Sequence, residues 1–242
     1  MQTMYTIFAE ETFERRMPAA NTLLQSGVSW GRFDELFTPA YWCGQAWQAK
    51  VHGHYGRLSL GNSLAEETAA CLLGGYGMPA EIGLAAFKRL RDRGLLTQVS
   101  PASDIERHLS EPFDLSGRSQ RYRFPRQKAG YLTACLAAIA DLDEDDLDDL
   151  SLRDQLTKMP GIGLKTASWI VRNRRLSSAV AVLDVHILRA GRIIGLFGET
   201  ESPSKDYLSL EARFVNLAEE IETPAWLLDA VMWQHMRLLR HA

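Results

Sequence analysis

Apolar residues recur along most of this chain at the three- and four-residue spacing of amphipathic helices, and alternating strand patterns are nearly absent. Several apolar stretches follow a helix-start signal, either a capping hydroxyl or a proline in the first turn; the clearest are Thr38-Pro39, Ser63 with Glu66, Pro79 and Thr223-Pro224. The pattern predicts about ten helices, over residues 39–51, 64–73, 79–93, 102–109, 126–141, 151–157, 164–174, 185–194, 206–221 and 224–239. It also admits a short hairpin near Val51–Leu60, so we expect a mostly helical fold.

Composition narrows the class of protein. The chain has 242 residues, of which 46% are hydrophobic and 24% charged, which suits a globular core and excludes disordered, collagen-like and miniprotein chains. No apolar run approaches the roughly 18 to 20 residues that a membrane span needs, and the N-terminus lacks a secretion signal. We therefore expect a soluble, cytoplasmic protein. Cys43, Cys71 and Cys135 form no CxxC pair, which predicts buried, reduced thiols rather than a metal centre.

The net charge of -3 conceals an uneven distribution. Seven acidic residues lie within Asp141–Asp149, and without them the remaining chain carries +4. Basic residues gather in Arg118–Lys128, which contains five cations, two aromatic residues and no acid, and again at Lys165, Arg172, Arg174 and Arg175. Both clusters could hold phosphates, and the alternative is that such charge runs are solvated helix faces. The acidic run has three interpretations: a helix cap, a face that repels DNA, or a solvated loop.

The most informative segment is residues 156–171, which reads as a short helix, a Pro160-Gly161-Ile162-Gly163 hairpin and a second helix. The glycines permit a tight turn with positive φ, while Ile162 anchors the hairpin in the core. Such a turn exposes backbone N–H groups beside the positive end of the second helix, which makes a phosphate site without base preference. The alternative is a plain interhelical turn.

Lys165 is predicted in the first turn of the second helix, where the macrodipole disfavours cations. It is either a surface contact to phosphate or a nucleophilic amine. The helix rises about 15 Å and the connector to Asp184 spans about 30 Å when extended, so the chain can return this carboxylate to the lysine. Asp184 is also the predicted N-cap of the helix starting at Val185. Together, an amine and an aspartate suit attack on the anomeric carbon of a nucleotide sugar.

Residues 159–171, MPGIGLKTASWIV, followed by residues 179–190, AVAVLDVHILRA, resemble the helix-hairpin-helix (HhH-GPD) superfamily of base-excision DNA glycosylases. The spacing from Lys165 to Asp184 and the Val-Asp-Val-His segment most resemble the 8-oxoguanine DNA glycosylases/AP lyases. The resemblance implies Lys165 as nucleophile, Asp184 as catalytic carboxylate, and DNA contacts at the hairpin and His186.

The resemblance also implies a base pocket. Gly44-Gln45 resembles a Gly-Gln pair whose backbone carbonyl accepts the N7 proton that distinguishes 8-oxoguanine from guanine. Asp229 and Trp233 lie four residues apart on one predicted helix face, so they would bond the base edge and stack on its ring. The alternative for Trp233 is core packing, and for Asp229 a first-turn helix acid.

This sequence departs from the family pattern in three places. The four-cysteine iron–sulfur loop of some relatives is absent, so no cluster or other cofactor and no metal is expected. The chain is also short upstream for the β-rich N-terminal domain of eukaryotic-type members. Relatives often carry polar residues that fill the gap left by an extruded base. This chain carries Gly74–Pro79 at that place, and Tyr76 is the candidate residue for filling the gap.

The resemblance implies an all-α fold with two helical subdomains and a DNA- and base-binding cleft between them. We predict a six-helix barrel over residues 60–178, with the helix-hairpin-helix at about 151–174, and a second domain from residues 1–59 and 179–242. The predicted function is a bifunctional glycosylase/AP lyase that excises 8-oxoguanine from damaged double-stranded DNA. We expect the protein to act as a monomer, to have no membrane partner, and to associate with the nucleoid if the organism is prokaryotic. The alternatives are a glycosylase for another base or a noncatalytic helix-hairpin-helix DNA-binding module.

Overall fold

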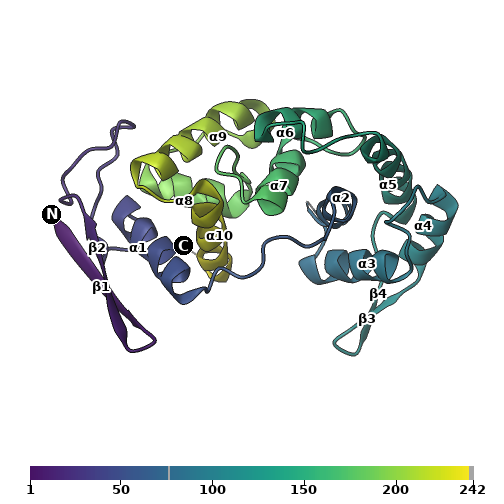
Figure 1. Ribbon diagram of the computed structural model, residues 1–242, viewed down its shortest axis with the longest axis horizontal. Coiled ribbons are helices and arrows are strands. Elements are labelled where there is room, and N and C mark those ends of the chain that lie inside the picture. Colours follow the sequence, from purple (N-terminus) through teal and green to yellow (C-terminus); the bar gives the residue numbers. More distant parts are fainter. Residues whose placement is uncertain (76, 240–242) are drawn as a thin grey trace. The chain divides into compact units, whose positions relative to one another are not determined.

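The computed structural model describes residues 1–75 and 77–239. Within these ranges it contains ten α-helices and two β-hairpins, which confirms the prediction of a mostly helical protein (Figure 1). The chain divides into two compact units. Unit 1 combines Met1–Leu58 with Leu176–Ala242, and unit 2 is the continuous segment Ser59–Arg175.

Unit 2 is built around one almost completely buried helix, α2. The chain order in this unit is α2 (Leu64–Leu73), α3 (Ala80–Asp92), α4 (Ala102–Ser110), β3 (Phe113–Leu115), β4 (Arg118–Gln120), α5 (Pro125–Ala140), α6 (Asp149–Thr157) and α7 (Leu164–Arg175). Helix α2 packs against α3, α5 and α7, while α4 packs on α5 and α6 on α7. Because α2 meets neighbours on several sides, its residues from Glu67 to Leu73 are all buried.

Unit 1 is organised around the C-terminal helix. It contains β1 (Gln2–Phe8), β2 (Glu11–Met17), α1 (Pro39–His52), α8 (Val185–Ile194), α9 (Pro203–Glu220) and α10 (Ala225–Leu238). Helix α10 packs against α1, α8 and α9, and the β1–β2 ribbon contacts α1. The two strands are antiparallel, with Gln2 opposite Met17.

Two of the four helix-start signals identified in the sequence operate as side-chain caps, whereas Pro79 and Pro224 stand just before α3 and α10 without a side-chain cap. The Thr38 hydroxyl accepts from the amide of Tyr41 at the start of α1, and Ser63 accepts from Glu66 at the start of α2. The Glu66 carboxylate in turn accepts from the amide of Asn62, which completes a reciprocal pair of bonds at this helix end. These caps explain why the starts of α1 and α2 agree with the predicted positions.

The predicted hairpin near Val51–Leu60 is wrong, and both observed hairpins lie elsewhere. Helix α1 continues to His52, and the amide of Leu60 bonds to a carboxylate rather than to a strand. The sequence pattern did not predict the β1–β2 ribbon, because most of its residues are exposed or partly exposed on both faces and hydrophobic alternation is therefore weak. Its turn residues, Ala9 and Glu10, both adopt positive φ although neither is a typical turn former.

No helix among the described residues is long and apolar enough to cross a membrane. All three cysteines are buried, as predicted, and none forms a disulfide in the described structure.

Candidate active site

The Pro160–Gly163 segment forms a tight turn between α6 and α7. The amide of Ile162 donates to the Met159 carbonyl at 3.2 Å, and the Ile162 side chain is only 5% exposed. Gly161 has φ +81°, and a Cβ at this position would overlap the ring of Tyr131 from α5. Only glycine satisfies both conditions, because an L side chain would be strained in this conformation and would also collide with the aromatic ring.

The turn presents backbone donors on its exposed side. Pro160, Gly161 and Gly163 are exposed, and the amides of the two glycines donate no hydrogen bond within the described part of the chain. Helix α7 follows directly, with the amide of Ala167 donating to the Gly163 carbonyl at 2.9 Å. Unpaired amides at a helix N-terminus form a cradle for an anion without any side-chain charge.

Lys165 is the second residue of α7, as predicted. The helix buries the face that carries Ala167, Ile170 and Val171, and no acidic residue lies in its first turn. Lys165 is partly exposed and its ammonium group makes no hydrogen bond or ion pair within residues 1–75 and 77–239. The amine is therefore not held by a structural partner.

Asp184 caps α8 in unit 1, as the sequence predicted. Its Oδ1 accepts from the amides of His186 at 2.8 Å and Ile187 at 3.0 Å. Both bonds use the same oxygen, so the carboxylate has a fixed orientation while Oδ2 has no donor in the described structure. One side chain thus serves as a cap and presents a second oxygen for chemistry.

The extended segment that leads into Asp184 is buried and is held by side chains from α9 and α10. Tyr207 Oη donates to the Ala181 carbonyl at 2.8 Å, and the Ala181 amide donates to Glu211 Oε1 at 3.1 Å. Asp229 Oδ2 accepts from the Val182 amide at 2.8 Å, and Asp229 is only 2% exposed. These bonds satisfy backbone groups that a strand would pair with another strand, and they fix the approach to Asp184.

His186 and Trp233 lie together in unit 1. Their rings meet edge to face, with centroids 6.3 Å apart and an interplanar angle of 87°. Trp233 is partly exposed, and the Arg237 guanidinium lies over its ring, 4.8 Å from the centroid. A partly exposed indole ring beside an imidazole suits a planar heterocycle next to a phosphate.

Gly44 is an interior, buried residue of α1, and Gln45 follows it partly exposed. A Cβ at Gly44 would come within 2.6 Å of the Met4 sulfur on β1. The glycine therefore lets the N-terminal ribbon approach this helix closely. As part of a helix, its carbonyl already takes part in the helical hydrogen-bond ladder with one of its two lone pairs.

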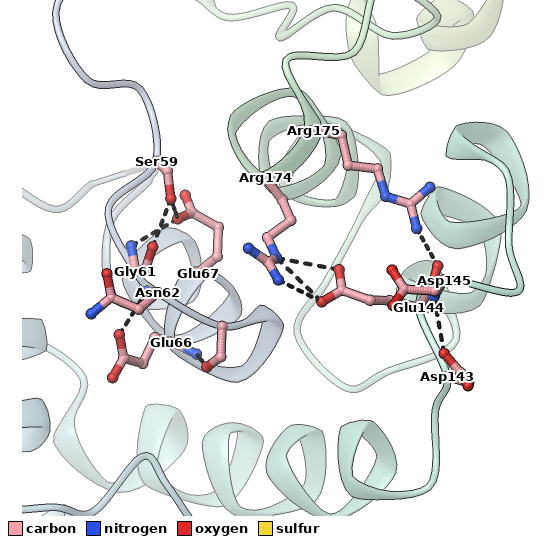
Figure 2. Close-up of polar contacts among 11 residues, drawn as sticks. Ser59, Gly61, Asn62, Glu66, Glu67, Asp143, Glu144, Asp145, Arg174 and Arg175 are labelled. Carbon is pink, nitrogen blue, oxygen red and sulfur yellow. Dashed lines mark hydrogen bonds and ion pairs between the residues drawn. The ribbon is translucent and has the colours of Figure 1, made fainter.

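Two members of the second basic cluster, Arg174 and Arg175, are paired with acids within unit 2 and so are not free charges (Figure 2). Arg174 Nη2 lies 2.8 Å from Glu144 Oε1, and this bond raises the pKa of Arg174. Arg175 Nη1 lies 3.0 Å from Asp149 Oδ1 and donates to the Leu147 carbonyl at 2.8 Å. The sequence could not pair these residues because they are 26 to 31 positions apart.

The same contacts explain the acidic run. Asp148 caps α6 by accepting from the amide of Ser151 at 2.7 Å, and backbone bonding lowers the pKa of Asp148. Glu144 and Asp149 supply the counter-charges for the end of α7. The run therefore combines a helix cap with an anchor for the second helix of the hairpin motif.

Glu67 is a buried acid that the sequence reasoning missed, and it lies at the same end of α7 (Figure 2). Its Oε2 accepts from the amides of Leu60 at 2.7 Å and Gly61 at 2.8 Å, while Oε1 accepts from Asn173 Nδ2 at 2.7 Å. The signal that could have identified it is the second of two adjacent acids, placed directly before the mostly apolar remainder of α2. This carboxylate joins the segment that enters unit 2 to the last turn of α7.

No group of three or more potential metal ligands occurs in the described ranges. Tyr76, the residue expected to fill the gap left by an extruded base, lies outside the described residues.

Comparison with known proteins places these features in a family. A family model described as 8-oxoguanine DNA glycosylase matches residues 56–223. The 8-oxoguanine DNA glycosylase/AP lyase of Metallosphaera sedula is 33% identical over 116 residues, which are 46% of this chain and 57% of that protein. Further curated relatives share 31% to 32% identity, and the chain spans no more than 60% of the length of these proteins.

Solved structures show the same fold. The crystal structure of Methanocaldococcus jannaschii 8-oxoguanine DNA glycosylase is 28% identical, with a TM-score of 0.56 over 71% of this chain and 77% of that chain. The Methanocaldococcus jannaschii 8-oxoguanine glycosylase/lyase in complex with 15mer DNA containing 8-oxoguanine is 24% identical. Its TM-score is 0.62 over 80% of this chain and 95% of that chain.

The family match covers the hairpin, Lys165 and Asp184 and extends over well over half of the chain. It confirms the resemblance that the hairpin motif and the Val-Asp-Val-His segment indicated. This chain therefore belongs to the helix-hairpin-helix 8-oxoguanine DNA glycosylase family.

Proposed function

We propose that this protein is a bifunctional DNA glycosylase/AP lyase that excises 8-oxoguanine from damaged duplex DNA in base excision repair. The observation that carries the proposal is the position of Lys165, directly behind a hairpin with exposed, unpaired amides and without a structural partner of its own. A hairpin that holds a backbone phosphate brings the neighbouring sugar close to this amine. Membership of the family supports the same activity.

The chemistry assigned to Lys165 is nucleophilic substitution at C1′ followed by elimination. The neutral amine forms an N–C1′ bond while the bond from C1′ to the base breaks, and the departing base takes the electron pair and a proton. Loss of the second amine proton and opening of the sugar ring give a Schiff base. Removal of a proton from C2′ then expels the 3′ phosphate, which cleaves the strand.

Asp184 is proposed to stabilise the positive charge that develops on the sugar. Two backbone donors fix its Oδ1, and Oδ2 is oriented with it. An acceptor that is already oriented needs little rearrangement when charge develops, which is the basis of electrostatic catalysis. The capping bonds are thus a support for the catalytic role.

The proposed base pocket draws on unit 1. We infer that Trp233 stacks on the extruded base, that Asp229 lines the pocket while it orders the segment before Asp184, and that His186 holds a phosphate. Gly44 and Gln45 complete the pocket, with the second lone pair of the Gly44 carbonyl as acceptor for the N7 proton of 8-oxoguanine.

Borohydride trapping tests the reaction, because it reduces a Schiff base to a stable covalent adduct. Two duplexes are compared, one with a single 8-oxoguanine and one with an abasic site. We expect wild-type protein to trap on both, and Lys165→Gln to trap on neither. Lys158→Gln is the matched control, since Lys158 lies just before the hairpin and bonds only to Gln155 in the described structure.

The base pocket needs a separate readout. Trp233→Ala is expected to lower trapping on the 8-oxoguanine duplex but not on the abasic duplex, because an abasic site offers no base to hold. Wild-type trapping on the abasic duplex alone would refute the assigned base and keep the lysine chemistry. Absence of trapping on both would instead support the noncatalytic DNA-binding module.

A further inference from the structure

The first basic cluster of the sequence differs from the second in having no counter-charge. We define the basic arm as Arg118, Arg121, Arg123, Arg126 and Lys128, all in unit 2. The four arginines are exposed, and none of the five cations forms an ion pair with an acid in the described ranges. By contrast, Arg174 and Arg175 are each paired with a carboxylate.

The arm is nevertheless a fixed element. Its first part is β4, which pairs antiparallel with β3, and its last part is the first turn of α5. Between them, Tyr122 is only 4% exposed and its Oη donates to the Leu73 carbonyl at 2.8 Å. This bond ties the arm to the end of the central helix α2, so the arginines project from an anchored backbone.

Helix α5 connects the arm to the hairpin. Gln127 Nε2 donates to Tyr131 Oη at 3.2 Å, and the Tyr131 ring lies against Gly161 of the hairpin. Cys135 Sγ donates to the Pro160 carbonyl at 3.6 Å. Six residues separate the start of α5 from Tyr131, which is about 9 Å along the helix axis. The last part of the arm, at the start of α5, therefore lies about 9 Å along the helix axis from the residue that contacts the hairpin.

The charges in α5 also oppose the helix dipole. Arg126 and Lys128 lie in its first turn, which contains no acidic residue, and no side chain caps its N-terminus. Burial lowers the pKa of Lys128. Five unpaired cations repel one another and two of them oppose a dipole, an arrangement that a bound polyanion would relieve.

We propose that the basic arm is a second phosphate-binding surface of unit 2, continuous with the hairpin, that holds the backbone of duplex DNA beside the lesion. The inference rests on the proposed function, since duplex DNA is the polyanion that this function provides. It assigns the arm a share of binding affinity but no contact with the reacting atoms.

The salt dependence of binding tests the proposal. The arm variant combines Arg118→Gln, Arg121→Gln and Arg126→Gln, and the control combines Lys88→Gln, Arg93→Gln and Arg107→Gln. The control removes the same charge from exposed positions of unit 2 outside the arm. Affinity is measured by fluorescence anisotropy on undamaged and abasic-analogue duplexes. The salt concentration is varied from about 50 to about 200 mM.

Each lost phosphate contact reduces the steepness of log affinity against log salt concentration by about 0.9. The arm variant lacks three contacts, so its slope should be less steep than that of the wild type by about 2.7. Over the stated range, the wild type then loses about fortyfold more affinity than the arm variant. The control should keep the wild-type slope. At saturating protein, the rate of trapping on the abasic duplex should stay within about twofold of wild type, because the reacting atoms are untouched.

An arm variant with the slope of the wild type, or with the same change as the control, would overturn the proposal. If the triple variant does not fold, Arg121→Gln alone should lower the slope by about 0.9. The binding slopes need no chemistry, so a wild type that binds but does not trap would refute the proposed activity without deciding the role of the arm.

Discussion

The buried Glu67 carboxylate offers a test of how unit 2 holds α7, the helix that carries Lys165. Removal by Glu67→Ala leaves the Gly61 amide and Asn173 Nδ2 buried without an acceptor, and it leaves the Leu60 amide partly buried. A buried donor without a partner costs about 1–3 kcal/mol, so the two fully buried donors predict a loss of about 2–6 kcal/mol. Because a typical domain is stable by about 5–15 kcal/mol, this is a large effect.

Glu67→Gln is the more informative variant, because it keeps the shape. When its NH2 group faces Asn173, the Asn173 amide must rotate so that Oδ1, which has no partner in the described structure, accepts, and Asn173 Nδ2 then loses its acceptor. One buried donor is left unpaired, so we expect a loss of about 1–3 kcal/mol. Adding Asn173→Asp supplies an acceptor for the new NH2 group and should restore most of the loss, which a double-mutant cycle would measure.

Urea unfolding gives the free energies, and hydrogen exchange of the amides at residues 60 and 61 gives the local effect. Glu66→Gln is the matched control. Glu66 is the adjacent acid, is partly exposed and accepts from a single backbone amide, so it should lose no more than about 1 kcal/mol. A Glu67→Gln loss equal to that of the control, together with unchanged exchange, would refute the assigned role of Glu67.

Three further outcomes follow from the site. Gly161→Ala should weaken DNA binding and lower the melting temperature, because its Cβ would overlap Tyr131 and φ is +81°; unchanged binding and melting would contradict this. Asp184→Asn should abolish trapping yet change stability by less than about 0.5 kcal/mol, since asparagine also caps helices, whereas Asp184→Ala should cost about 1 kcal/mol. Burial raises the pKa of Cys135 to about 11, so its thiol should react with a disulfide reagent at pH 8 far more slowly in the native than in the unfolded protein.

The hairpin motif was predictable because its geometry is local. The Pro-Gly-Ile-Gly turn, the helix start at Leu164 and the Asp184 cap each depend on residues within a few positions of one another. Local backbone preferences and capping therefore determined them, and the helices with clear start signals also appeared where predicted. The missed β1–β2 ribbon lacks both signals, since its strands are exposed and its turn has no glycine or asparagine.

The sequence by itself determined that this chain is mostly helical and where its hairpin, amine and capping aspartate lie, because those features arise from short-range patterns. Only the tertiary structure decided which charges are available. It paired Arg174 with Glu144, enclosed Glu67 and left the arginines of the basic arm without an acidic partner among residues 1–75 and 77–239. Two basic clusters that look equivalent in one dimension therefore differ in the folded protein, since ion pairing depends on distance in space and not on position along the chain.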